Sequence, residues 1–256
     1  MNVEVHEGDG PYLLLVHGIL SSRAQWLLNL PALQEVSRPV VVELHGHGRS
    51  LAPDDPAAYT PDGYVAAFDD IRRSLGVDRW AVCGQSLGAA LTLRYVLDHP
   101  DRVIASVFTN SASALADEGW RQGIERSLPP LVDDVRARGR AALDSLPIHP
   151  RQAKRLPPEV AGALVADAEL LDPEGLAKTF EHTVPASSVR CRVAATAVPT
   201  LLVVGRRERA FLPSVEHART AIAGLEVVEL DAGHAVNAQA ADGFDDAVRR
   251  FLGSHA

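Results

Sequence analysis

The stretch Trp80-Ala-Val-Cys-Gly-Gln-Ser-Leu-Gly-Ala-Ala-Leu-Thr-Leu-Arg-Tyr95 decides how the rest of the chain is interpreted. Its first four residues read as a buried strand, and the residues from Leu87 onward predict a helix that Pro100 ends. Between strand and helix lies Gly84-Gln85-Ser86-Leu87-Gly88, which is a G-x-S-x-G sequence in the strand-turn-helix context that this motif requires. Because side chains at the two glycine positions would collide, Ser86 is predicted to lie on a sharp, strained turn.

Alternating strand and helix patterns extend on both sides of this turn. Short apolar runs bounded by turn residues predict strands, and one stripe of apolar residues in every turn predicts amphipathic helices. The predicted strands cover residues 12–16, 39–44, 80–83, 103–109, 200–204 and 225–230, and the predicted helices cover residues 60–75, 87–99 and 243–252. This alternation is typical of an α/β protein with a parallel sheet covered by helices on both faces.

The strand signals are absent between residues 111 and 185. That segment is helical and polar in pattern, and prolines are expected to interrupt it, among them the pair Pro129-Pro130. An insertion between two parallel strands belongs over their carboxyl ends, where open α/β sheets bind ligands. We therefore divide the chain into a core of residues 1–111 and 186–256 and a helical cap of residues 112–185.

Composition narrows the classes of partner. The chain has 256 residues, a formal net charge of −8 and 46% hydrophobic residues, which is typical of an ordinary globular protein. An acidic balance argues against nucleic acid or an anionic membrane as the partner. We find no signal peptide, no apolar run of about 18 residues, no metal-ligand spacing and no phosphate-binding loop. The expectation is a cytoplasmic protein that acts on a small molecule without a metal or a cofactor.

Four further segments resemble the α/β-hydrolase superfamily, and together with the turn they span nearly the whole chain. Leu14 to Ile19 resembles the strand and HG loop of that superfamily, and Glu43 to Ser50 resembles its D-x-x-G-x-G-x-S loop with Glu43 in place of the usual Asp. Val198 to Pro213 resembles the segment that carries the triad acid, and Ala232-Gly233-His234 resembles the late G-H. The resemblance implies a mostly parallel eight-stranded sheet with a helical cap inserted after the sixth strand.

The candidate catalytic residues follow the chain order serine, acid, histidine that this superfamily uses. Ser86 would be the nucleophile, and His234, just after a late predicted strand, would take its proton. Glu208 lies three residues after Gly205, at the position of the family's acid, and would orient His234. Asp231 is the rival acid, although it lies only three residues before His234. The other histidines are interpreted as structural.

Acyl transfer also needs hydrogen-bond donors for the oxyanion that forms on the substrate, and side chains that line the substrate pocket. The backbone N–H of Leu87, directly after the nucleophile, is one expected donor to the oxyanion, and by resemblance the N–H of Ile19 is the other. Trp26 and Trp120 are candidate pocket residues, each with the alternative of packing in the core. Basic residues between positions 136 and 155 form either a solvated helical face or a rim that receives an anionic substrate or an acidic carrier protein.

Three functions fit these residues. The first is serine hydrolysis of a carboxylic ester or related acyl bond in a small to medium, largely apolar substrate. The second keeps the triad for cofactor-free C–C bond hydrolysis, a lyase reaction or a biosynthetic tailoring step, because a fold does not determine its chemistry. The third is a ligand-binding receptor with residual turnover. The sequence does not indicate the oligomeric state.

Overall fold

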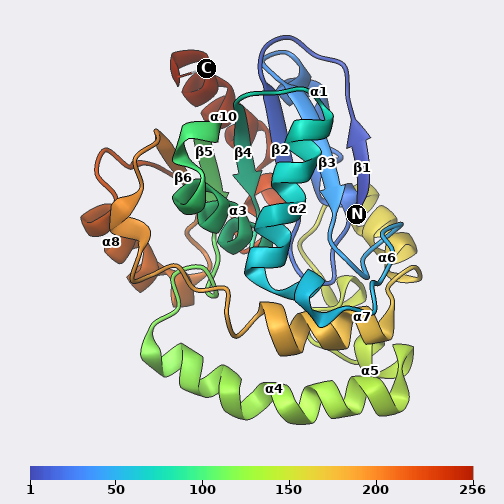
Figure 1. Cartoon of the computed structure of the whole chain (residues 1–256). Coiled ribbons are helices and arrows are strands. Elements are labelled where there is room, and N and C mark those ends of the chain that lie inside the picture. The colour runs from blue at the N-terminus through green and yellow to red at the C-terminus, as the bar shows by residue number, and fades with distance from the viewer. Residues whose placement is uncertain (256) are drawn as a thin grey trace.

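Seven strands form one twisted sheet in the computed structural model, which describes residues 1–255. The strand order is β1-β3-β2-β4-β5-β6-β7, and only β1 runs antiparallel to its neighbour, β3 (Figure 1). The strands are β1 (Asn2–Val5), β2 (Tyr12–Val16), β3 (Arg38–Glu43), β4 (Trp80–Gly84), β5 (Val103–Thr109), β6 (Thr200–Gly205) and β7 (Glu226–Leu230). The parallel strands therefore present their carboxyl ends at one edge.

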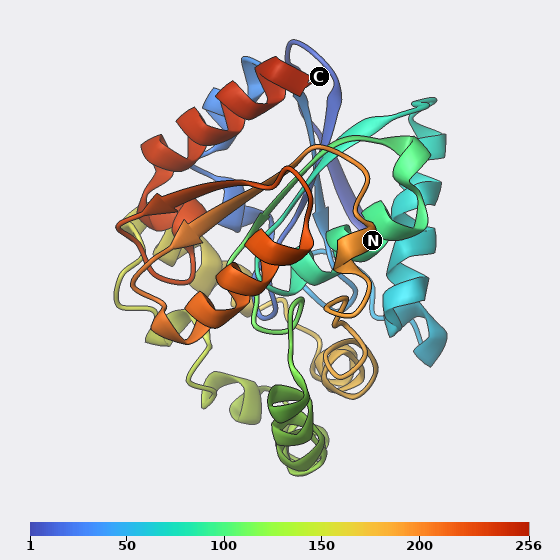
Figure 2. The same ribbon diagram turned by 90° about the vertical axis from the view of Figure 1, so that its left-hand side faces the viewer.

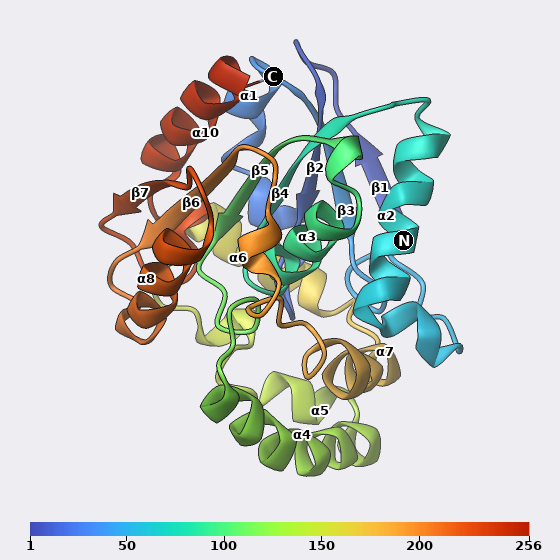
Figure 3. The same ribbon diagram turned by 60° about the vertical axis from the view of Figure 1, so that its left-hand side comes forward.

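Helices cover both faces of the sheet, as the alternating pattern predicts. Helices α2 (Pro61–Ser74), α3 (Leu87–Asp98) and α8 (Leu212–Ala221) pack on one face, and α1 (Leu30–Gln34) and α10 (Ala241–His255) pack on the other (Figure 3). Successive β2 residues illustrate the division, because Leu14 belongs to the core beneath α2 and α3 whereas Leu15 belongs to the core beneath α10. Alternation along a strand sends neighbours to opposite faces.

Four further helices lie between β5 and β6 and cover the carboxyl edge of the sheet (Figures 1 and 2). They are α4 (Glu118–Arg138), α5 (Arg140–Asp144), α6 (Pro158–Ala168) and α7 (Pro173–Lys178), and a π-helical turn over Thr179–Thr183 follows. The interruption expected at Pro129-Pro130 is wrong, because α4 continues through both prolines. Because proline has no N–H, the carbonyls four positions earlier, at Glu125 and Arg126, lose their helical donors. Both residues are exposed, so water can bond these carbonyls.

The number of strands differs from the eight implied by resemblance. Within residues 1–255 only β1 precedes β2, so the cap follows the fifth strand and not the sixth. Strand β1 was not predicted, because its four residues are polar and apolar in turn and none is buried. Within the same residues, no helix is both long enough and apolar enough to span a membrane.

Candidate active site

The turn between β4 and α3 holds Ser86 in a strained backbone conformation. Its φ of 54° and ψ of −117° lie in a region that non-glycine residues rarely occupy. A Cβ at Gly84 would lie 2.4 Å from the Gly88 carbonyl oxygen, and one at Gly88 would lie 2.2 Å from the Val16 carbonyl oxygen. Both glycines are therefore required by close backbone approach, as the sequence predicts.

Three predicted residues from distant parts of the chain form one hydrogen-bonded row. The Ser86 hydroxyl donates to His234 Nε2 at 2.8 Å, and His234 Nδ1 donates to the Glu208 carboxylate at 2.9 and 3.0 Å. The His234 side chain is 47% exposed and the Glu208 side chain 25% exposed, so solvent and substrate can reach the imidazole. The arrangement is that of a nucleophile, a base and a group that orients the base.

Glu208 is held as a carboxylate from two sides. Burial raises its pKa, but hydrogen bonding and charge from His234 and a hydrogen bond from Asn110 outweigh burial, so the pKa lies below its ordinary value. Asn110 Nδ2 donates to Glu208 Oε2 at 2.7 Å, and the same amide bonds both the N–H and the carbonyl of Gly205. Sequence reasoning assigned no role to Asn110, whose only signal was its position directly after a predicted strand.

Asp231, the rival acid, pairs with two arginines and not with the histidine. Arg207 Nε donates to Asp231 Oδ1 at 2.9 Å, and Arg206 Nε lies 3.6 Å from the same oxygen. This carboxylate is about half exposed and its pKa is lowered by Arg207. Asp231 therefore belongs to a surface ion pair, which leaves Glu208 beside the imidazole.

The candidate oxyanion donors are two backbone N–H groups, those of Ile19 and Leu87. Neither Ile19 nor Leu87 donates its N–H to another group within residues 1–255. A Cβ at Gly18 would lie 2.9 Å from the Ser86 Cβ, so the loop after β2 lies directly against the serine. The binding of an oxyanion by these two N–H groups stays a prediction.

Two buried histidines brace that loop. His47 Nε2 accepts from the Leu20 N–H at 3.2 Å, and His17 Nε2 accepts from the Leu44 N–H at 3.1 Å. Burial lowers the pKa of His17 to about 3 and that of His47 to about 4. Both rings are therefore neutral at pH 7, as an acceptor at Nε2 requires, and both are structural as the sequence predicts.

A cavity of about 360 Å³, called here the Ser86 cavity, opens beside the serine. Its wall is mostly apolar and combines the loop after β2, the nucleophile turn, the histidine loop and cap residues between positions 148 and 164. The lining residues are Gly18, Ile19, Leu20, Ser21, Gln25, Gln85, Ser86, Ile148, Pro150, Ala153, Leu156, Leu164, His234, Ala235 and Gln239. None is Lys, Arg, Asp or Glu, so the cavity suits an uncharged ligand.

The two candidate pocket tryptophans do not line this cavity. Trp26 is fully buried and packs against Phe244 with ring centroids 6.3 Å apart. Trp120 is half-buried at the start of α4 and packs against the apolar cluster that α2 and α3 share with the cap helices. The alternative interpretation, packing, is the one observed for both. Nothing in the sequence separated the two uses, because an indole fills either environment.

Two glutamine side chains connect the loops around the serine. Gln85 Nε2 donates to the His234 carbonyl at 3.3 Å, and Gln239 Oε1 accepts from the Gly233 N–H at 2.5 Å. The histidine loop is therefore held from the nucleophile turn on one side and from α9 (Val236–Gln239) on the other. Sequence reasoning missed both contacts.

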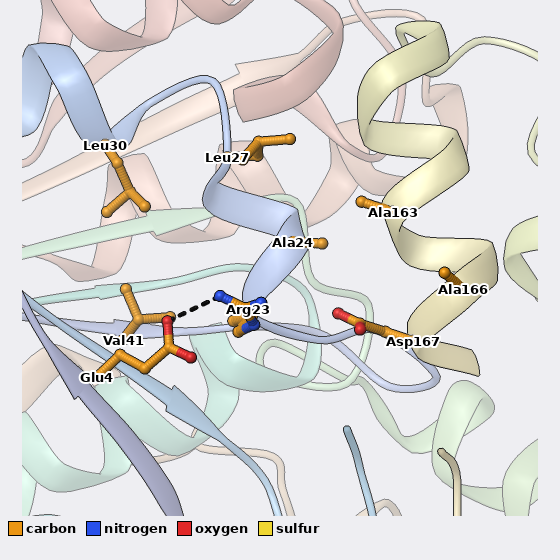
Figure 4. Close-up of a pocket in the computed structure, with 9 residues that line it drawn as sticks. All are labelled: Glu4, Arg23, Ala24, Leu27, Leu30, Val41, Ala163, Ala166 and Asp167. Carbon is orange, nitrogen blue, oxygen red and sulfur yellow. Dashed lines mark hydrogen bonds and ion pairs between the residues drawn. The ribbon is translucent and has the colours of Figure 1, made fainter. Parts of the chain in front are cut away.

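A second cavity of about 260 Å³, the Arg23 cavity, lies between the first turn after β2 and α6 (Figure 4). Arg23 lies between Glu4 and Asp167 in this view, and its guanidinium pairs with Glu4 at 3.0 Å. Asp167 accepts from the Ser22 hydroxyl at 2.6 Å and from Arg49 at 3.1 Å. These contacts tie the cap helix α6 to the core, and the cavity carries no nucleophile.

The basic residues of the cap are largely paired within the cap. Arg136 pairs with Glu174 and Glu181, and Arg138 pairs with Asp134. Arg140 donates to the carbonyls of Ala168 and Leu171 at 2.8 and 3.1 Å, and Arg151 pairs with Asp144 and Glu169. These pairs favour the solvated-face interpretation of the basic run. Within residues 1–255, no three His, Cys, Asp or Glu side chains gather as metal ligands.

A serine on a strained strand-to-helix turn, a histidine and carboxylate in line with it, and a parallel sheet beneath define the class of α/β hydrolases. A family model described as the alpha/beta hydrolase fold matches residues 11–241. The chain belongs to this family and is an enzyme of the hydrolase class, with esterase-like relatives.

Three relatives are similar over nearly the whole chain. A Klebsiella pneumoniae protein, provisionally named as the carbamate hydrolase RutD, is 29% identical to this chain. The match covers 93% of this chain and 90% of the relative. Carboxylesterase YbfK of Bacillus subtilis is 25% identical, with 95% of this chain and 81% of the relative covered. The crystal structure of the enol-lactonase from Burkholderia xenovorans LB400 is 25% identical with a TM-score of 0.84, and 98% of this chain and 96% of that chain are covered.

Proposed function

We propose that this hydrolase cleaves a carboxylic ester or a related acyl bond of a small to medium, largely apolar substrate through an acyl-enzyme on Ser86. The observation that carries the proposal is the continuous hydrogen-bonded row from Ser86 through His234 to Glu208. The apolar wall of the Ser86 cavity and the relatives named as a carboxylesterase and an enol-lactonase support it. Residues 112–185 act as the cap that closes over the substrate.

Acylation begins when Ser86 Oγ attacks the acyl carbon and its proton passes to His234 Nε2. The carbonyl oxygen becomes an oxyanion that accepts from the Ile19 and Leu87 N–H groups. Glu208 stabilises the imidazolium that has formed. When the bond between the acyl carbon and the leaving group breaks, His234 returns the proton to the leaving oxygen and the alcohol departs.

Deacylation repeats these steps with water as the nucleophile. His234 Nε2 takes a proton from water as the water oxygen attacks the acyl carbon, and the same two N–H groups hold the second oxyanion. The Ser86 oxygen then leaves with the proton from His234, which releases the carboxylic acid. The net reaction consumes one water and one ester and needs no cofactor.

Labelling with a fluorophosphonate probe tests the nucleophile. Intact protein should gain one phosphonyl group, located at Ser86 by peptide mass spectrometry, and Ser86→Ala should gain none. Ser127→Ala, at an exposed serine on α4, is the matched control and should label like the wild type. Folded wild-type protein that does not label at Ser86 would overturn the proposal.

A series of 4-nitrophenyl esters of increasing acyl length then tests the reaction. Hydrolysis should be measurable for short acyl chains and should be lost in Ser86→Ala. Labelling at Ser86 without turnover of any ester in the series would reject ester hydrolysis and favour C–C cleavage or another use of the same residues.

A further inference from the structure

A second row of hydrogen bonds begins in the wall of the Ser86 cavity and runs into the core. The Ser21 hydroxyl is 3.1 Å from Gln25 Oε1, and Gln25 Nε2 is 2.8 Å from Asn237 Oδ1. Asn237 Nδ2 is 3.0 Å from Asn29 Oδ1, and Asn29 Nδ2 is 2.8 Å from Asp245 Oδ1. Ser21 and Gln25 line the cavity, whereas Asn29 and Asn237 are fully buried.

Main-chain carbonyls determine which end of each asparagine amide donates. Asn29 Nδ2 also contacts the Asn237 carbonyl at 2.9 Å, and Asn237 Nδ2 also contacts the Gln25 carbonyl at 2.8 Å. A carbonyl oxygen can only accept, so each of these atoms must be the amide nitrogen. Asn237 Oδ1 is then an acceptor, and the Gln25 atom facing it must be the nitrogen.

The orientation of Gln25 determines what Ser21 can offer. Because the Gln25 nitrogen faces Asn237, the Gln25 atom facing Ser21 is the oxygen, which can only accept. The single hydroxyl proton of Ser21 is committed to this contact. Ser21 Oγ therefore presents only its lone pairs to the cavity, and a ligand group that meets it must be a hydrogen-bond donor.

We propose that Ser21 determines substrate specificity by accepting a hydrogen bond from an O–H or N–H group of a neutral acyl substrate. The proposal rests on the proposed function, since it concerns the same cavity. Two observations point to a neutral substrate: the cavity wall carries no Lys, Arg, Asp or Glu, and its remaining surface is mostly apolar. A hydroxylated or amide-bearing acyl compound meets both requirements, whereas an ether oxygen at the same place would face the lone pairs of Ser21.

Matched substrates measure this preference. The first pair is the 4-nitrophenyl esters of 3-hydroxybutanoate and 3-methylbutanoate, the second is the corresponding 2-hydroxy and 2-methyl butanoates, and the third is 2-hydroxyethyl and propyl acetate. The methoxy analogue of each hydroxylated compound keeps the oxygen but lacks the donor. The ratio of kcat/KM within each pair is compared between wild type and variants, so that intrinsic ester reactivity cancels.

The wild type should favour the hydroxylated member of at least one pair, and the methoxy analogue should resemble the methyl compound. Ser21→Ala should lower that ratio about tenfold, the usual contribution of one neutral hydrogen bond. Ser21→Thr, which keeps the hydroxyl, should retain the ratio. Leu156→Ala, the matched control, alters the same wall without a polar group and should affect both members of a pair alike.

Gln25→Met tests the direction of the row. With its acceptor removed, the Ser21 hydroxyl is free to donate, so discrimination against the methoxy analogue should disappear if the variant melts as a folded protein. A Ser21→Ala ratio equal to that of the wild type in all three pairs would overturn the inference. Fluorophosphonate labelling of each variant separates the proposals: if Ser86 labels and esters are hydrolysed without a donor preference, only the role of Ser21 fails.

Discussion

Two hydrogen-bonded rows start at a serine in the Ser86 cavity and end at a carboxylate, and they differ in what lies between. The row from Ser86 passes through the imidazole of His234 to Glu208, whereas the row from Ser21 passes through three amides to Asp245. An imidazole can take up a proton and return it, but a side-chain amide at neutral pH cannot. The first row is therefore suited to activating its serine, and the second to restricting the orientation of its serine.

The two terminal carboxylates have pKa values displaced in opposite directions. The pKa of Glu208 is lowered because the contributions of His234 and Asn110 outweigh burial. Burial raises the pKa of Asp245 to about 6, against a hydrogen bond from the uncharged amide of Asn29. Glu208 faces a group able to become cationic and stays ionised, whereas Asp245 accepts its hydrogen bond from an uncharged amide and bears the cost of burial.

The largest expected effect on kcat comes from replacing His234, the middle member of the row that starts at Ser86. His234→Gln replaces the imidazole with an amide and should lower kcat about 10,000-fold, because no group can then accept the Ser86 proton. Since the His234 side chain is 47% exposed, thermal stability should change little. Ester kinetics and thermal melts of the same preparation measure both quantities.

Asn237→Ala is the matched change in the other row. It removes a fully buried amide and leaves the facing groups of Gln25 and Asn29 without partners, so the free energy of unfolding should fall by about 3 kcal/mol. The kcat of the folded protein should fall far less than in His234→Gln. If His234→Gln keeps most of its activity, the first row does not carry the proton.

Replacing Glu208, the carboxylate at the end of the same row, should have the next largest effect on kcat. Glu208→Gln should lower kcat about 1,000-fold or more, because a neutral amide neither stabilises the imidazolium nor selects its tautomer. Asp231→Asn is the control, since Asp231 pairs with Arg207 on the surface, and it should keep most of the activity. The reverse ranking of the two kcat values would assign the acid role to Asp231.

Much of the first row could be predicted from sequence because each of its members stands in a local motif. Ser86 lies between two glycines, Glu208 lies three residues after Gly205, and His234 ends a late Gly-His pair. The order of the parallel strands then brings the three together at one sheet edge. Such positions depend on short-range spacing, which a single sequence displays.

The second row could not be predicted, because its members share no local pattern. Gln25 and Asn237 are 212 residues apart, and their contact depends on how α9 packs against the turn after β2. The wrong pocket assignment of Trp26 and the missed first strand have the same origin, which is long-range packing. Whether Trp26 faces a cavity or the core, and whether four residues such as Asn2–Val5 pair as a strand, is decided by tertiary packing.

The smallest effect on activity is expected at Asp245, which contributes a pH dependence to stability instead. Its pKa is about 6 in the folded protein against an ordinary value of 3.8, so between these values the folded state binds more protons than the unfolded state. The free energy of unfolding should therefore fall as pH rises through this range, by at most about 3 kcal/mol. Asp242 and Asp246 strengthen the shift, and Arg249 opposes it.

Asp245→Asn should remove this slope and keep the contact with Asn29, since the new amide oxygen can accept the same hydrogen bond. Urea unfolding at pH 4.5 and pH 8 should show the variant gaining stability relative to the wild type at the higher pH, while kcat changes little. A stability difference that is the same at both pH values would mean that Asp245 ionises without cost in the folded protein. The contrast between the two rows would then lie in the imidazole alone, because both carboxylates would be stable anions.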